Sequence, residues 1–117
     1  MRRDVHYYFQ KACRRQLKPL TVPMRVIADD DVQAGFAIRL GSTERIDIID
    51  YRCTTCVTLI ALCEHLAEEL RDSTIEFARS LTAGQILALH PEIPSSRGSR
   101  AQLAVAAVHA ALENISS

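Results

Sequence analysis

The spacing of the apolar residues changes at Cys53. Before it, Phe36, Ile38 and Leu40 alternate with other residues, which is the two-residue period of a half-buried strand. Beyond it, apolar residues recur at spacings of four and three, the period of an amphipathic helix: Cys56, Ile60, Cys63, Ala67 and Leu70. Strands on one side of such a change and helices on the other are typical of an α+β domain.

The remaining elements fit the same fold class. A first helix is predicted over residues 4–17, capped by Asp4, and a short edge strand over residues 24–27. The turn residues 41–43 join two strands into an antiparallel hairpin, in which Ile46 and Ile48 are expected to share one face. Later helix starts are predicted at the capping residues Thr54 or Thr55, Ser73 or Thr74, Thr82 with Gln85, and Ser99. We therefore expect a three-stranded antiparallel sheet with helices packed on one face, in a single domain spanning residues 1–117.

Composition narrows the class of partner. The chain has 14 basic and 14 acidic residues, so no net field draws nucleic acid or anionic lipid to it. Basic residues near the amino end are expected to form a solvated helix face. No apolar run approaches the roughly 20 residues of a membrane span. The sequence therefore predicts neither nucleic acid nor a membrane as a partner.

The four cysteines are expected to be free thiols in the cytoplasm. Three of them lie within eleven positions, and no export signal accompanies them. Residues 53–56 form a C-x-x-C, but thioredoxin-type chemistry requires a βαβ context, whereas the strands here are expected to be antiparallel. Cys56 and Cys63 share the apolar stripe of the predicted helix, which favours core thiols. A ligand role for Cys56 beside Cys53 stays open, although no second C-x-x-C completes a zinc signature.

Cys53 has the features of a reactive thiol. It precedes a predicted helix, where unpaired N–H groups and the helix dipole favour a thiolate. Arg52, together with Arg97 or Arg100 from the last loop, would add positive charge. The alternative is an ordinary loop cysteine. The four histidines lie on helices or at a helix end without ligand spacing, and are expected to be surface or helix-end residues.

A hairpin that leads into a cysteine and then a long helix resembles the NifU N-terminal/IscU type of iron–sulfur cluster scaffold. The matching stretch is Ile46-Asp47-Ile48-Ile49-Asp50-Tyr51-Arg52-Cys53. Ser73-Thr74-Ile75-Glu76-Phe77-Ala78 is similar to the family's Thr-x-Glu-x-Ala segment. Ile93-Pro94, the basic loop and the last helix are similar to the family's Pro-rich loop and final helix. The resemblance covers residues 24–115 and, more loosely, the first helix.

The resemblance implies a site built from three loops, each giving one cysteine, because several thiolates must converge to hold a cluster. By position, the second cysteine is Cys53. The first falls on Asp30, with its companion Asp at Val32, and the third falls on Arg100. The glycine that precedes the central cysteine is replaced by Arg52. Most of the family's metal ligands are therefore replaced in this chain.

Two functions follow from the resemblance. One is a scaffold in which Cys53, with Cys56 and Asp30, binds an iron–sulfur cluster or zinc. The other is a sulfur acceptor similar to the SufE group, which works with one loop cysteine. Residues 81–89 and 94–97 also resemble that group. Cys53 would then accept sulfur as a persulfide from a cysteine desulfurase or another assembly protein. The alternatives are a non-catalytic interaction module with a degenerate scaffold fold and a zinc-stabilised structural domain.

Overall fold

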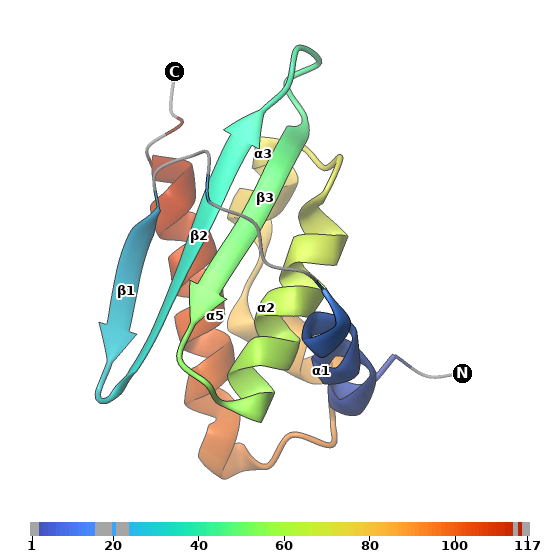
Figure 1. The fold of residues 1–117 in the computed structure, drawn as a ribbon, viewed down its shortest axis with the longest axis vertical. Helices are drawn as coiled ribbons and strands as arrows, with labels where there is room; N and C mark the ends of the chain where they lie inside the picture. Colours follow the sequence, from blue (N-terminus) through green and yellow to red (C-terminus); the bar gives the residue numbers. More distant parts are fainter. Residues whose placement is uncertain (1–2, 16–19, 21–23, 114, 116–117) are drawn as a thin grey trace.

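A computed structural model describes residues 3–15, 20, 24–113 and 115, and confirms the α+β prediction (Figure 1). The three strands are consecutive in the chain, with one helix before them and the other helices after them. The elements are α1 (Val5–Arg14), β1 (Arg25–Asp29), β2 (Val32–Leu40), β3 (Ile46–Cys53), α2 (Val57–Leu70), α3 (Ile75–Ser80), α4 (Ala83–Leu89), the 3₁₀ turn η1 (Ser95–Arg97) and α5 (Gly98–Glu113). The first helix ends at Arg14 because Arg15 is extended, so it is shorter than predicted. Residues 16 and 17, and residue 114 at the predicted end of the last helix, lie outside the described residues.

The three strands form one antiparallel sheet in the order β1-β2-β3. Ala34 of β2 pairs with Cys53 of β3, and Phe36 pairs with Tyr51. The register shifts at Leu40, which pairs with Ile46, so that Asp47 is an extra residue in β3. This bulge corrects the predicted face of β3. The buried side carries Ile46, Ile49 and Tyr51 rather than Ile46 and Ile48.

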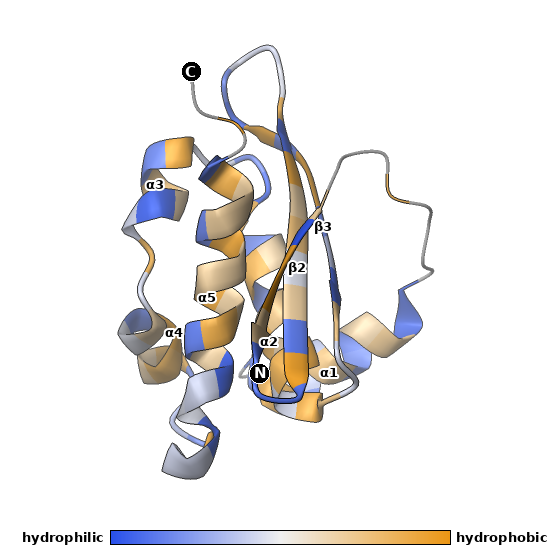
Figure 2. Cartoon of the chain, turned by 90° about the vertical axis from the view of Figure 1, so that its left-hand side faces the viewer, coloured by the Kyte–Doolittle hydropathy of each residue, from blue (hydrophilic) through white to orange (hydrophobic). Residues whose placement is uncertain are grey.

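Helices α2 and α5 cover the inner face of the sheet. Figure 2 shows α3, α4 and α5 together on one side of it. α5 packs against β1 and β2, α2 packs against β3, and α1 lies against α2. The contact is tight because α5 presents small side chains to the sheet and to α2. Its fully buried alanines are Ala101, Ala104 and Ala107.

Capping residues start most helices where the sequence predicts. The Asp4 side chain accepts from the N–H of Tyr7 at 2.9 Å, and Thr74 caps α3 in the same way. Thr82 and Gln85 form the predicted capping box of α4. The last helix begins at Gly98 rather than after a cap at Ser99, because the 3₁₀ turn before it runs directly into the helix. Among the described residues, no helix has the length and apolar character needed to cross a membrane.

A buried polar network joins α1, α2 and β3. The Tyr51 hydroxyl donates to Oε1 of Glu64 at 2.6 Å, and Glu64 is only 4% exposed. The Arg15 guanidinium lies 3.2 Å from the same oxygen and 3.0 Å from Oδ1 of Asp50. A buried carboxylate needs such partners, because charge without hydrogen bonds is costly away from water. The network therefore fixes β3 on α2 just before the strand ends at Cys53.

Removing the Tyr51 hydroxyl should weaken this attachment without emptying the core. We expect Tyr51→Phe to lower the free energy of unfolding by about 1–2 kcal/mol, because Glu64 loses a buried hydrogen bond. Urea unfolding followed by circular dichroism measures the change. Tyr7→Phe is the matched control, since Tyr7 contacts Tyr8 and Arg3 through its ring. Equal stability of the two variants would contradict the role assigned to the hydroxyl.

A second polar cluster lies between α1, α2 and the end of α4. Nδ1 of His65 and Nε2 of His90 are 2.7 Å apart, and Nδ1 of His90 lies 3.2 Å from Oε2 of Glu92. Because a carboxylate only accepts, His90 donates from Nδ1 and accepts from His65 at Nε2. The Tyr8 ring stacks on His65 with centroids 4.4 Å apart. His65 and His90 are both buried, which corrects the expectation of surface positions, although His90 does end α4.

Burial makes this cluster sensitive to acid. It lowers the pKa of His65 to about 4, with the neighbouring His90 adding to the effect. The unfolded chain binds a proton at this residue below about pH 6.5, whereas the folded chain does not until about pH 4. The stabilisation is therefore complete above pH 6.5 and is lost progressively as the pH falls to 4.

We expect the wild type to lose about 2 kcal/mol more stability than His65→Gln between pH 7 and pH 4. Gln keeps a hydrogen-bonding group but cannot titrate. Urea unfolding at a series of pH values gives the slope of the unfolding free energy against pH for each protein. The difference between the two slopes removes the contribution of the titratable groups that both proteins share. His6→Gln, at an exposed position of α1, should keep the wild-type slope. Parallel slopes for the wild type and His65→Gln would show that His65 titrates normally.

Candidate functional site

Three connections meet at one end of the sheet, the lower end in Figure 1. They are the β1–β2 turn, the β3–α2 connection and the turn into α5. Their side chains line an open cavity of about 430 Å³, which includes Asp31, Cys56, Arg97 and Arg100. Two hydrogen bonds hold the first two connections together: Thr54 N–H donates to the Gln33 carbonyl at 2.9 Å, and Gln33 N–H donates to the Thr54 hydroxyl at 2.8 Å.

Cys56 is the residue that begins α2. It has extended backbone angles, and its carbonyl accepts the first helical hydrogen bond, from Ile60 at 2.8 Å. The sequence predicts Thr54 or Thr55 at this place. Thr54 does not cap the helix because its hydroxyl already accepts from Gln33. A sulfur atom therefore occupies the position where helices usually place a hydroxyl or carboxylate.

The surroundings of Cys56 favour its thiolate. Partial burial alone would raise the pKa of the Cys56 thiol. The backbone N–H of Leu59, the guanidinium of Arg100 and the N–H of Thr58 lower this pKa by more than burial raises it, so the net shift is downward. These N–H groups lie at the amino end of α2, where the helix dipole also stabilises negative charge. Cys56 thus has the properties that the sequence assigns to Cys53.

Arg100 gives the cavity its charge. Its Nε atom is buried and makes no hydrogen bond within the described part of the chain. Arg97, at the end of the 3₁₀ turn, lines the same cavity and is exposed. Two guanidinium groups against the single carboxylate of Asp31 leave the lining positive. Such a cavity favours an anionic ligand or an ionised sulfur.

Cys53 lies in a different environment. It is the last residue of β3, three positions before Cys56, and its side chain packs against the hydrophobic cluster that contains Cys63. Hydrogen bonding with the Cys63 thiol lowers the pKa of Cys53 against the opposing effect of burial, whereas the same interaction and full burial raise the pKa of Cys63. The predicted helper Arg52 directs its guanidinium to Oδ1 of Asp50 at 3.1 Å and to the Tyr51 carbonyl at 2.7 Å. Cys63 is a core thiol, as predicted.

The predicted metal ligands are not assembled. Within residues 3–15, 20, 24–113 and 115, no group of three or more His, Cys, Asp or Glu side chains is arranged to hold a metal ion. Asp30 occupies the β1–β2 turn with a positive φ of 55°, and its neighbour Asp31 is the carboxylate that lines the cavity. Asp30, Cys53 and Cys56 therefore do not form such a group in this structure.

Compared with known proteins, the chain matches no protein-family model and no curated protein. The residues that line the cavity therefore carry the functional argument.

The contribution of Arg100 to the reactivity of Cys56 can be measured directly. We expect Arg100→Gln to raise the pKa of Cys56, since it removes a positive charge from the thiolate. The rate of alkylation of Cys56 by iodoacetamide, followed against pH by mass spectrometry, should then rise at higher pH than in the wild type. Arg79→Gln, on α3 and outside the cavity, is the control and should leave the profile unchanged. An unaltered profile in Arg100→Gln would rule out this electrostatic role.

Proposed function

We propose that this chain is a sulfur acceptor in iron–sulfur cluster assembly and that Cys56 is the acceptor. One observation carries the proposal: a thiol with a lowered pKa begins α2, beside Arg100, at an open cavity. Such an arrangement is typical of nucleophilic cysteines. A single thiol is sufficient for this reaction, so the loss of the other family ligands does not prevent it.

The reaction needs only thiol chemistry. The Cys56 thiolate attacks the outer sulfur of a cysteine persulfide on a donor enzyme. The donor's S–S bond breaks, its cysteine leaves as a thiolate, and Cys56 becomes a persulfide. The product carries negative charge near neutral pH, which Arg100 and Arg97 would stabilise in the positive cavity. Thiol–disulfide exchange follows the same course, with a thiolate as attacking and leaving group.

The resemblance to the scaffold family also supports a site at this end of the sheet. That family takes one ligand from each of three loops, and three connections converge here on one cavity. By position the family's ligands fall on Asp30, Cys53 and Arg100, and the cavity is lined by the neighbouring Asp31, by Cys56 and by Arg100. Only the central one is a cysteine. In this chain the third position, Arg100, would hold a persulfide by charge instead of holding a metal by a thiolate.

A cysteine desulfurase is the proposed donor. It generates the persulfide, and the open cavity leaves Cys56 accessible to a partner's loop. All four cysteines are free thiols, which suits a protein that works in a reducing compartment such as the cytoplasm.

Incubation with a cysteine desulfurase and cysteine tests the proposal. We expect intact-mass spectrometry to show a gain of one sulfur atom, lost on reduction with dithiothreitol and absent from Cys56→Ser. Cys53→Ser and Cys13→Ser are matched controls that should still gain the sulfur.

The other outcomes separate the alternatives. A sulfur gain that disappears only in Cys53→Ser would move the acceptor to Cys53. No gain in the wild type would favour the non-catalytic interaction module. Iron and sulfide in protein purified without oxygen would instead support a scaffold, and zinc a metal-stabilised domain.

A further inference from the structure

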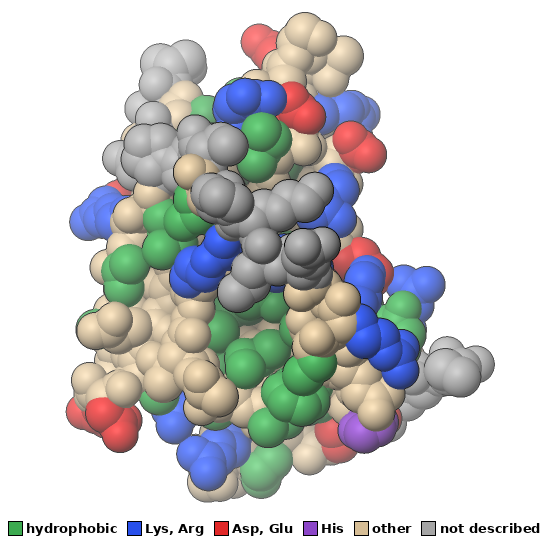
Figure 3. Space-filling model, in the orientation of Figure 1, with side chains coloured by type: hydrophobic (Ala, Val, Ile, Leu, Met, Phe, Trp, Pro, Cys, Tyr) green, Lys and Arg blue, Asp and Glu red, His purple; other side chains and the backbone are tan. Residues whose placement is uncertain are grey.

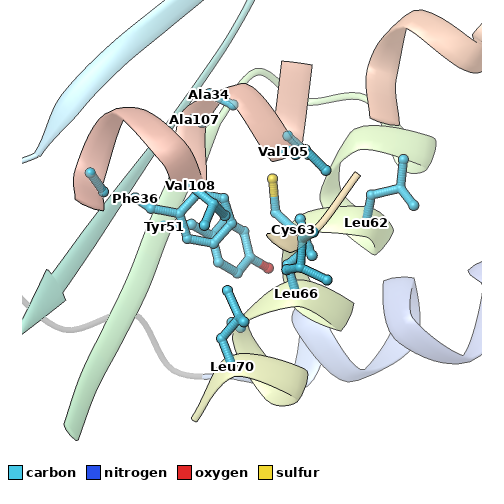
Figure 4. Close-up of a cluster of buried hydrophobic side chains, with 14 of the residues drawn as sticks. Ala34, Phe36, Tyr51, Leu62, Cys63, Leu66, Leu70, Val105, Ala107 and Val108 are labelled. Carbon is cyan, nitrogen blue, oxygen red and sulfur yellow. The ribbon is translucent and has the colours of Figure 1, made fainter. Parts of the chain in front are cut away.

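Two cysteines that the proposed sulfur transfer does not use lie against each other. Cys53 is paired with Ala34 across the β2–β3 ladder. In Figure 4 the sulfur of Cys63 leaves α2 in the direction of Ala34 and Val105. The strand register and the helix orientation thus bring the two thiols to the same part of the core, where both pack in one hydrophobic cluster. The Cys63 thiol also lowers the pKa of Cys53, as expected of neighbouring groups.

The two thiols differ in their access to solvent. Cys63 is fully buried, at 0% exposure. Cys53 lines a cavity of about 330 Å³ beside Met24 and Val26, and a second of about 320 Å³ beside Cys13 and Ile60. Figure 3 shows apolar side chains gathered between the end of β3 and α1, on the side of the second cavity. A small reagent can therefore reach Cys53 but not Cys63.

We propose that Cys53 and Cys63 are a redox-active pair, in which a hydroperoxide oxidises Cys53 and Cys63 then forms an internal disulfide with it. In the first step the Cys53 sulfur attacks the outer oxygen of hydrogen peroxide. The O–O bond breaks, water leaves, and Cys53 becomes a sulfenic acid. In the second step the Cys63 sulfur attacks the Cys53 sulfur, the S–O bond breaks, and a second water leaves with the proton of Cys63. Two thiols and one peroxide give one disulfide and two waters.

The geometry permits this bond. A disulfide places its two sulfur atoms about 2 Å apart, and rotation of the Cys53 side chain toward Cys63 would close that bond. Cys53 ends its strand and is followed by the β3–α2 connection, whereas Cys63 is fixed within α2. The disulfide would tie β3 to α2 next to the Tyr51–Glu64 hydrogen bond, where the two elements already pack together.

Cys56 is not the expected partner of Cys53, although the two form a C-x-x-C. Its sulfur faces the cavity that contains Asp31 and Arg100, and its thiolate is stabilised by Arg100 and by the backbone of α2. The disulfide would therefore leave Cys56 reduced. The inference does not depend on the proposed sulfur transfer, and each can fail without the other.

Treatment of the purified chain with hydrogen peroxide tests the pair. We expect the number of thiols that react with Ellman's reagent after denaturation to fall from four to two, with recovery after dithiothreitol. Blocking with iodoacetamide, reduction and labelling with N-ethylmaleimide then mark the oxidised cysteines. Tandem mass spectrometry is needed to locate them, because Arg52 and Arg71 place three of the four cysteines in one tryptic peptide. The two labels are expected on Cys53 and Cys63.

The variants separate this pair from its rivals. Cys53→Ser and Cys63→Ala should form no internal disulfide, while Cys56→Ser and Cys13→Ser should form it as the wild type does. Cys53→Ser, at a partly exposed position, keeps the test decisive if Cys63→Ala does not fold. A disulfide that includes Cys56 or Cys13 in the wild type would overturn the inference, and so would peroxide that carries Cys53 to a sulfinic acid with Cys63 still reduced.

Discussion

The inner face of the three-stranded sheet is buried against α2 and α5, and the other features of the molecule depend on this contact. A sheet of this size has too small an apolar face to be stable alone. Phe36, Leu59 and Leu66 are fully buried at the contact, and the alanines of α5 allow the helix backbone to approach the strands closely. Because both helices start at the end of the sheet where β3 finishes, the same contact brings Cys56 and Arg100 to one cavity.

The periodicity of the sequence was sufficient to predict the elements and their class. The alternation of apolar residues in 36–40 and their helical spacing after Cys53 both arise because one face of each element is buried. Such a pattern is a local property of the chain. The face of β3 was predicted wrongly beyond Ile46 because Asp47 forms a bulge. A bulge follows from pairing with another strand and leaves no local signal in an otherwise regular pattern.

The features expected of Cys53 are divided between two cysteines in the structure. The expected arrangement, a thiol at a helix amino end beside an arginine of the last loop, is present at Cys56 with Arg100. The difference between the predicted and the observed start of α2 has a physical cause. The Thr54 hydroxyl that could have capped the helix bonds instead to Gln33, a residue distant in sequence, and the helix starts two residues later. The partnership of His65 with His90 was missed for the same reason, since 25 positions separate them.

The sulfur at the start of α2 also has a thermodynamic cost. Serine or threonine at an N-cap typically stabilises a helix by about 1 kcal/mol over a residue that makes no capping hydrogen bond, and Cys56 makes none of ordinary geometry. Selection for a sturdy fold alone would therefore favour serine at this position. Serine would strengthen the start of α2 but would remove the ionisable thiol, so stability and reactivity make opposite demands on this one residue.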